Sequence, residues 1–256
     1  MIEFNQYDRK IPSESLDYKK NSDEAVKQIE KLMNYKIKEK QNVIDIQISL
    51  RQGLPMENIH RIAAPIVEQW AIETFEDTVG VEGYDFIGVE VTGSRTSLVD
   101  LVLSFKSEES IGFPVGVDVK GTSMDIASAG KSPNITSFAK IRTAYINDNN
   151  FIFVILSLKH QVFTDNTEEK AKQSLIIKEA NAYDLKYLRE KEFTINPALG
   201  TGQIQISDIH YVSADEERTA EQFVELLDSK FLSIKENSVK KWADLAEKNN
   251  WLKEQL

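Results

Sequence analysis

Hydrophobic residues recur along this chain with two different periods, which predict helices and strands in alternation. A spacing near 3.6 residues marks segments that should form amphipathic helices with one apolar face. Helices are expected from residue 22 onward, over 59–77, from 132 to about 147, over 181–190, and over 216–235 and 238–252. In the second of these, Ile62, Ile66, Trp70 and Phe75 should form much of the apolar face.

Strands are predicted where apolar residues alternate with polar ones or form a short continuous run. They are expected over 85–92, 97–105, 113–120, 151–158, 174–178 and 203–212. The continuous run at 151–158 is typical of a central strand buried on both faces. Residues 42–50 alternate like a strand but could also continue the preceding helix. This order of elements predicts an α/β fold, a mixed β-sheet flanked by helices.

Polar and small residues between the periodic segments predict where helices begin and where loops lie. Ser22 or Asp23 should cap the first helix, and Ser238 the last one. Ser132 followed by Pro133 predicts a helix start, because proline fits the first helical position. The small-residue segment 121–132 is expected to be a mobile loop.

Composition narrows the class of protein and the kinds of site it could hold. The chain has 256 residues, 41% hydrophobic, with a net charge of −10 and no cysteine, which excludes disulfides and thiolate nucleophiles. No apolar run reaches 18 residues and the first ten residues do not resemble a signal peptide, so we expect a cytoplasmic protein with no membrane association. The histidines, His60, His160 and His210, lack metal-ligand spacing and are expected at the surface or at strand ends.

Three charged residues interrupt two otherwise apolar strands. Asp100 falls within 97–105, while Asp118 and Lys120 fall two residues apart within 113–120 and should share one face of the strand. A single acid there could be an edge charge that discourages aggregation. Three charges buried without partners would cost several kcal/mol. We therefore expect a divalent cation and an anionic substrate at this point.

The charge pattern around these residues indicates the class of substrate. Residues 120–142 hold Lys120, Lys131, Lys140 and Arg142 against Asp125 alone. A basic path beside an acid pair suits a phosphodiester, although the overall negative charge argues against nonspecific coating of nucleic acid.

Phosphodiester hydrolysis gives each of the candidate residues a role. The scissile phosphate must be neutralised, a water activated and the leaving oxygen stabilised. Mg²⁺ suits this task and takes oxygen ligands, which Asp100, Asp118 and the carbonyl of Val119 could supply. Lys120 could hold the attacking water and offset charge that develops on the phosphate.

The arrangement of Asp100 and the Asp118-Val119-Lys120 triplet on a hairpin resembles the PD-(D/E)xK nuclease core. The segments LVDLVLSF, GVDVKGTS, SPNITSFAKIRTAYINDN and INPALGTGQIQISDI are similar to type II restriction endonucleases of that superfamily, represented by HincII and EcoRV. The similarity spans about residues 60–210. Val99 stands where the motif has proline, and two loops differ in length, which leaves the target sequence open.

The resemblance implies a homodimer that cuts both strands of duplex DNA with Mg²⁺ and leaves 5′-phosphate ends, blunt by analogy. It implies a nuclease core over 59–212, a helical dimerisation region over 1–58, and C-terminal helices over 213–256 that pack on the core. Glu68, on the helix before the core, best matches an acid that assists the metal site, although it could also be a solvated helix residue.

DNA contacts are also assigned by the resemblance. The loop from residue 196 to 203 should read base edges in the major groove, and the 121–134 loop should approach the minor groove or phosphates. The residues assigned to DNA binding are Lys131, Asn134, Lys140, Arg142, Asn196, Gly200, Thr201, Gly202 and Gln203. Two alternatives stay open at this point: a structure-specific or damage-specific repair nuclease of the same superfamily, and an inactive DNA-binding module.

Overall fold

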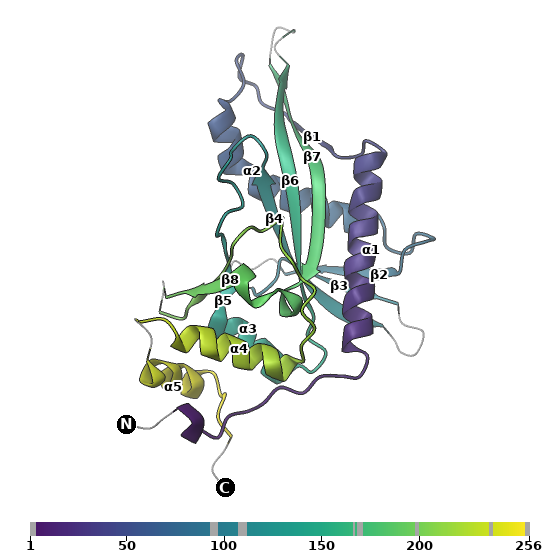
Figure 1. The fold of residues 1–256 in the computed structure, drawn as a ribbon. Coiled ribbons are helices and arrows are strands. Elements are labelled where there is room, and N and C mark those ends of the chain that lie inside the picture. Colours follow the sequence, from purple (N-terminus) through teal and green to yellow (C-terminus); the bar gives the residue numbers. More distant parts are fainter. Residues whose placement is uncertain are drawn as a thin grey trace. The chain divides into compact units, whose positions relative to one another are not determined.

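The chain folds into two compact units, each with its own β-sheet (Figure 1). The computed structural model describes residues 4–92, 97–106, 112–165, 167, 171–197, 200–235 and 238–253. The large-sheet unit comprises residues 20–131 and 152–184, and the small-sheet unit comprises residues 1–19, 132–151 and 185–256. This division follows different boundaries from the three segments expected from the sequence.

The large-sheet unit contains a six-stranded mixed sheet and two long helices. Its elements are α1 (Tyr18–Lys38, whose first two residues belong to the other unit), β1 (Val43–Ile46), α2 (Met56–Glu76), β2 (Phe86–Val91), β3 (Leu101–Phe105), β4 (Phe113–Ser123), β6 (Phe153–Asp165) and β7 (Lys172–Asp184). The strand order is β1-β7-β6-β4-β3-β2. Only the pairing of β4 with β6 is parallel among these strands. The predicted mixed sheet with flanking helices is confirmed.

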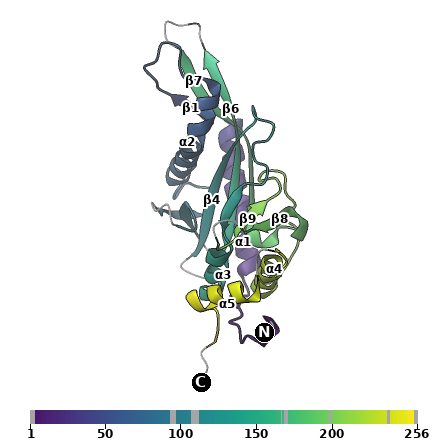
Figure 2. The ribbon, with the colours of Figure 1, turned by 90° about the vertical axis from the view of Figure 1, so that its left-hand side faces the viewer.

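The predicted central strand is also confirmed. β6 lies between β4 and β7 (Figure 2), and residues 153–158 are all buried. A strand that is covered on both faces favours apolar residues at every position. This explains why residues 151–158 form a continuous apolar run. The strand predicted at 42–50 as one of two possibilities is β1, at the edge of the sheet.

The buried face of helix α2 matches the prediction only in part. Phe75 is fully buried as predicted, Ile66 and Trp70 are half-buried, and Ile62 is 40% exposed. Ile59, Ala63 and Val67 are fully buried in addition. The reason is close packing, because a Cβ built on Gly121 of β4 would lie 3.2 Å from Val67 Cβ. Small residues at this interface let the helix approach the strand, so side-chain size and not hydrophobicity alone decides which face is buried.

The start of α1 was predicted wrongly. The helix begins at Tyr18 rather than near Ser22. Ser22 is buried inside the helix, and its hydroxyl donates a hydrogen bond to Asp184 Oδ2 at 2.7 Å. A serine that binds a tertiary partner is indistinguishable by sequence from a serine that caps a helix.

The small-sheet unit combines a three-stranded antiparallel sheet with three helices. Its elements are a short 3₁₀ turn (Phe4–Gln6), β5 (Asn134–Ser137), α3 (Phe138–Asn147), 3₁₀ turns at Leu185–Tyr187 and Glu190–Glu192, β8 (Phe193–Asn196), β9 (Gln203–Ile206), α4 (Ala220–Leu232) and α5 (Val239–Lys248). The strand order is β5-β9-β8. The predicted cap Ser238 is confirmed, since its hydroxyl accepts from the Lys241 amide.

The Ser132-Pro133 pair does not start a helix, contrary to the prediction. Residues 134–137 instead form β5, which pairs with β9, and the helix begins at Phe138 with Ser137 as its cap. The helix predicted at 181–190 is also wrong, because β7 continues to Asp184. In both places a strand partner distant in sequence overrides a local helix signal.

Other differences concern the ends of elements. β3 begins at Leu101, four residues later than predicted, and β9 ends at Ile206 rather than 212. The predicted loop after Lys120 is shorter, since β4 continues to Ser123. The polar turn between the two charged strands includes residues 107–111, which lie outside the described residues. No helix among the described residues is long and apolar enough to cross a membrane.

Candidate active site

Asp118 and Lys120 meet on β4 as the two-residue period of a strand predicts. Lys120 Nζ donates to Asp118 Oδ1 at 2.6 Å. The lysine side chain is 26% exposed and the aspartate side chain 8% exposed. The pair therefore places a solvent-accessible cation directly beside a buried carboxylate.

The second oxygen of the Asp118 carboxylate has no partner. Oδ2 is buried and accepts no hydrogen bond from the part of the chain that the structure describes. Burial raises the pKa of Asp118 to about 6, the nearby Lys120 opposes the rise, and the charges of Asp100 and Glu68 add to it. A buried carboxylate with an unused oxygen and a raised pKa is a candidate for a functional group.

Asp100 is held against β4 by two contacts, just before β3 rather than inside it as predicted. Its backbone N–H donates to the carbonyl of Val117 at 3.0 Å. Its carboxylate Oδ2 accepts from the backbone N–H of Val119 at 2.7 Å. These contacts fix the second acid of the motif beside the residue that separates Asp118 from Lys120.

Glu68 lies on α2 close enough to the pair of strands to respond to their charges. Burial raises the pKa of the Glu68 carboxyl, the Asp100 charge raises it further, and Lys120 lowers it. The helix therefore contributes a third acid to the electrostatics of the site.

The donor set fits a hard cation bound through few protein ligands. No group of three or more His, Asp or Glu side chains among the described residues is arranged to hold a metal ion. Mg²⁺ does not need such a cage, because it commonly takes one or two carboxylates together with waters and substrate phosphate oxygens. The unpaired Asp118 Oδ2 is the observation that favours this mode of binding.

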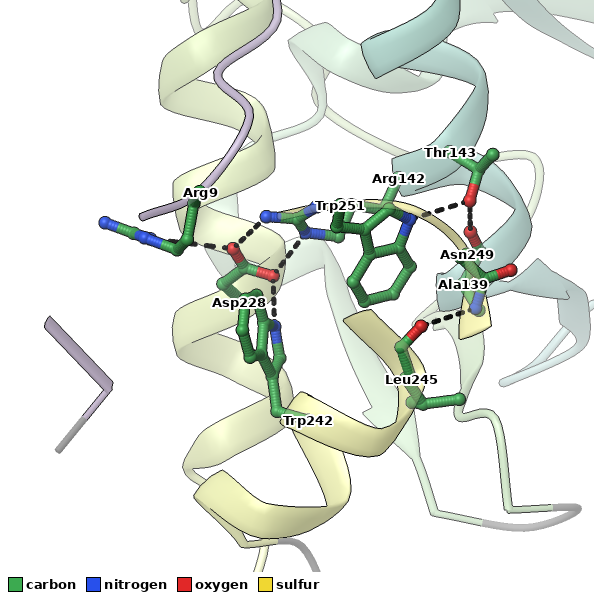
Figure 3. Close-up of polar contacts among 9 residues, drawn as sticks. All are labelled: Arg9, Ala139, Arg142, Thr143, Asp228, Trp242, Leu245, Asn249 and Trp251. Atoms are coloured by element: carbon green, nitrogen blue, oxygen red, sulfur yellow. Dashed lines mark hydrogen bonds and ion pairs between the residues drawn. The ribbon is translucent and has the colours of Figure 1, made fainter. Parts of the chain in front are cut away.

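Arg142 cannot contact a phosphate, contrary to the prediction. Its side chain is 1% exposed. Nε and Nη2 donate to the two oxygens of Asp228 at 2.8 and 3.0 Å, and the guanidinium lies 4.3 Å from the Trp251 ring centroid (Figure 3). Asp228 also accepts from Trp242 Nε1 at 2.9 Å. Arg142 is a buried structural cation of the small-sheet unit.

The other predicted DNA-binding residues, apart from Gly202, keep accessible positions. Lys131 and Lys140 are exposed, and Asn134 is exposed at the start of β5. Asn196 and Gln203 face each other across the β8–β9 pair. The loop between these two strands includes Gly200 and Thr201, which are described, and residues 198 and 199, which lie outside the described residues.

Gly202 combines two requirements that only glycine meets at the end of this loop. Its φ is +72°, and a Cβ there would lie 2.9 Å from Ile195 Cγ2. The residue is buried, so it shapes the loop from within and does not present itself to a ligand.

The three histidine side chains are buried rather than at the surface or at strand ends as expected, with His210 only 6% exposed. Two of them also lie close together. His160 is 2% exposed within β6, its ring centroid lies 6.1 Å from that of His60 on α2, and His60 Nε2 lies 3.8 Å from Asp125 Oδ2. Burial and the neighbouring His60 lower the pKa of His160 to about 4, which Asp125 partly opposes. No sequence signal pairs residues a hundred positions apart.

Sequence comparisons with known proteins relate this chain to restriction enzymes. The family model of type II restriction endonuclease HpaI matches residues 5–250. The type II restriction enzyme HpaI of Haemophilus parainfluenzae is 40% identical over 260 residues, which cover 99% of this chain and 100% of that enzyme. A solved structure of NlaIV restriction endonuclease gives a TM-score of 0.46 at 10% identity, covering 86% of this chain and 87% of that one. The predicted resemblance is confirmed, and the chain belongs to the HpaI family of type II restriction endonucleases.

Proposed function

We propose that this type II restriction enzyme requires Mg²⁺ and binds it at the Asp100–Asp118 pair. The observation that carries the proposal is the buried, unpaired Oδ2 of Asp118, 2 residues from a lysine that already occupies the other oxygen. Asp100, Asp118 and the Val119 carbonyl would hold the ion. A bound Mg²⁺ neutralises phosphate charge and lowers the pKa of its water.

The remaining residues of the site orient the reactants. Lys120 has the exposure to reach a water or a phosphate oxygen from its place beside Asp118. Its positive charge would stabilise negative charge that develops on the scissile phosphate. Glu68 would assist through its charge, because it interacts electrostatically with Asp100 and Lys120.

The enzyme would act as a homodimer that leaves blunt, 5′-phosphate ends. The described residues contain one Asp100–Asp118–Lys120 cluster per chain, so cutting both strands in one encounter needs two chains. Sedimentation equilibrium of the protein with and without duplex DNA would measure this; a monomer in both states would contradict the dimer. The dimerisation role of residues 1–58 stays a prediction, as does action in the cytoplasm.

DNA contact by the accessible predicted residues is part of the same proposal. Lys131 and Lys140 would contact phosphates, which position the enzyme without reading sequence. Asn196 and Gln203, with Gly200 and Thr201 of the loop between them, would approach base edges, and buried Gly202 would shape that loop. Asn134 was expected near the minor groove or phosphates, but it pairs with Gln205 on the same sheet, so we propose that it approaches base edges as well.

Digestion of phage DNA tests the proposal directly. The protein with Mg²⁺ should produce discrete bands, and sequencing of the ends should show one short recurrent site with 5′-phosphates. A chelator should stop the reaction, and Asp118→Ala should abolish cutting while specific binding to the site persists.

Other patterns of digestion would point elsewhere. A smear, or cutting of branched DNA alone, would support a repair nuclease, and no cutting with any divalent metal would support an inactive module. Membership of the HpaI family favours neither alternative.

A further inference from the structure

The three strands of the small sheet carry no charged side chain, although 28% of the chain is charged. Each strand has four residues, with the sequences NITS in β5, FTIN in β8 and QIQI in β9. Every polar position in these strands is therefore an amide or a hydroxyl.

The two faces of the β8–β9 pair differ. The buried face of these two strands is apolar and consists of Phe193, Ile195, Ile204 and Ile206, whereas β5 buries the hydroxyl residues Thr136 and Ser137. Because side chains alternate along a strand, the other face carries Thr194, Asn196, Gln203 and Gln205. These four side chains are partly or fully exposed, so one face anchors the sheet in its unit and the other is available to a ligand.

The strand register gathers amides from all three strands. Gln205 pairs with Asn134 on one side and with Thr194 on the other. Gln203 pairs with Ser137 and with Asn196. Directly paired side chains stand about 5 Å apart, so Asn134, Asn196, Gln203 and Gln205 form one continuous patch, which we call the amide face.

The dimensions of the amide face match those of the DNA major groove. Three strands spaced about 4.8 Å apart span about 10 Å, and the major groove is about 12 Å wide. Gln203 and Gln205 stand about 6.8 Å apart along their strand, which equals about two base-pair steps of 3.4 Å.

The chemistry of the amide face points to one class of base pair. Asn and Gln both donate and accept, and they bind N6 and N7 of adenine in a bidentate manner. Guanine is read most often by Arg or Lys, and the three strands contain neither. We propose that the amide face reads adenine in A·T base pairs of the recognition site, with Gln205 as a specificity residue alongside Gln203.

This inference rests on the proposed DNA contact of the small-sheet unit, and its test begins from the site found by sequencing the digestion ends. Duplexes carrying that site are made with each adenine replaced in turn by 7-deazaadenine, which lacks the N7 acceptor. For at least one adenine, the wild-type kcat/KM should fall about 5- to 150-fold.

The variants Gln203→Ala and Gln205→Ala show whether that loss belongs to the amide face. If a glutamine binds the affected N7, its alanine variant should cut the unmodified site with a lower kcat/KM than the wild type does. Replacing that adenine by 7-deazaadenine should then lower the kcat/KM of the variant by less than about twofold. Gln161→Ala is the matched control, since Gln161 is an exposed strand amide on β6 of the large-sheet unit. It should respond to 7-deazaadenine as the wild type does, and circular dichroism melting checks that all variants are folded.

Three outcomes would overturn the inference. A recognition site without A·T pairs, or a 7-deazaadenine effect that is equal in wild type and both glutamine variants, would overturn it while the restriction activity stands. A failure to produce any discrete digestion would overturn the proposed function and this inference together.

Discussion

Two buried aspartates of this protein, Asp118 and Asp228, are each paired with a cation but differ in how completely they are bonded. Asp228 receives hydrogen bonds on both oxygens, from Arg142 and from Trp242 (Figure 3). Asp118 uses one oxygen for Lys120 and leaves the other buried and unpaired. A carboxylate with both oxygens bonded, like that of Asp228, is typical of a structural ion pair, whereas the unpaired oxygen of Asp118 leaves a position for a ligand.

Asp118→Asn should give the largest effect, on activity and not on folding. It removes the anionic oxygen proposed to hold Mg²⁺, so single-turnover cutting of a duplex with the recognition site should fall about 1,000-fold or more. Specific DNA binding by gel shift should remain. Cutting within tenfold of the wild type would remove Asp118 from the reaction.

Asp228→Ala should show the opposite behaviour, a loss of stability. It leaves the Arg142 guanidinium buried without its partner, which costs about 3–5 kcal/mol. Urea unfolding followed by tryptophan fluorescence measures it, because Trp242 and Trp251 lie in this unit. The matched control is Asp215→Ala, which breaks the exposed pair with Arg189 and should leave the urea midpoint nearly unchanged, because exposed ion pairs contribute little to stability.

The pH dependence of Asp118→Asn sharpens the contrast further. The pKa of Asp118 is raised from 3.8 to about 6 in the folded protein, so the folded state binds more protons than the unfolded state between these values. Stability is therefore lost as pH rises through this window. Without metal, Asp118→Asn should be more stable than wild type at pH 8 by up to about 3 kcal/mol, and the difference should vanish near pH 4.

Thermal unfolding in chelator at pH 4, 6 and 8 checks this prediction. A variant less stable than wild type at pH 8 would mean that the Asp118 carboxylate supports the fold, as Asp228 does.

Trp242→Phe should give the smallest effect, because it removes one hydrogen bond from Asp228 and keeps an aromatic ring. A bond to a charged group is worth about 1.5–3 kcal/mol. Trp251→Phe is the control, since Trp251 Nε1 donates to the neutral hydroxyl of Thr143 at 2.8 Å and should cost about 1 kcal/mol. Equal losses in urea unfolding would show that the Asp228 charge adds nothing.

The sequence predicted that Asp118 and Lys120 share one face of a strand, but it gave no indication that Asp228 binds Arg142. The first pair depends on the two-residue period of a strand, which is local. The partner of Arg142, Asp228, lies 86 residues away in the sequence. The sequence alone therefore could not correct the prediction that Arg142 is an exposed helix residue that contacts phosphate. Local patterns therefore located the residues proposed to be catalytic, but burial decided which cation remained accessible.

The fold shows the same limit. The apolar run of β6 predicted a central strand because its environment is uniform on both faces. Ser132 and Pro133 predicted a helix start, but residues 134–137 pair with β9 as strand β5. Helix α2 buries Ala63 rather than Ile62 because Gly121 lets the helix approach strand β4 closely. These outcomes depend on residues far apart in sequence.

Calorimetric titration of the metal-free protein with Mn²⁺ tests the central claim most directly, since Mn²⁺ takes the same oxygen ligands as Mg²⁺. Wild type and Trp242→Phe should bind the ion alike, and Asp118→Asn should lose this binding. Unchanged binding in Asp118→Asn would contradict the claim that the unpaired oxygen of Asp118 is the metal position.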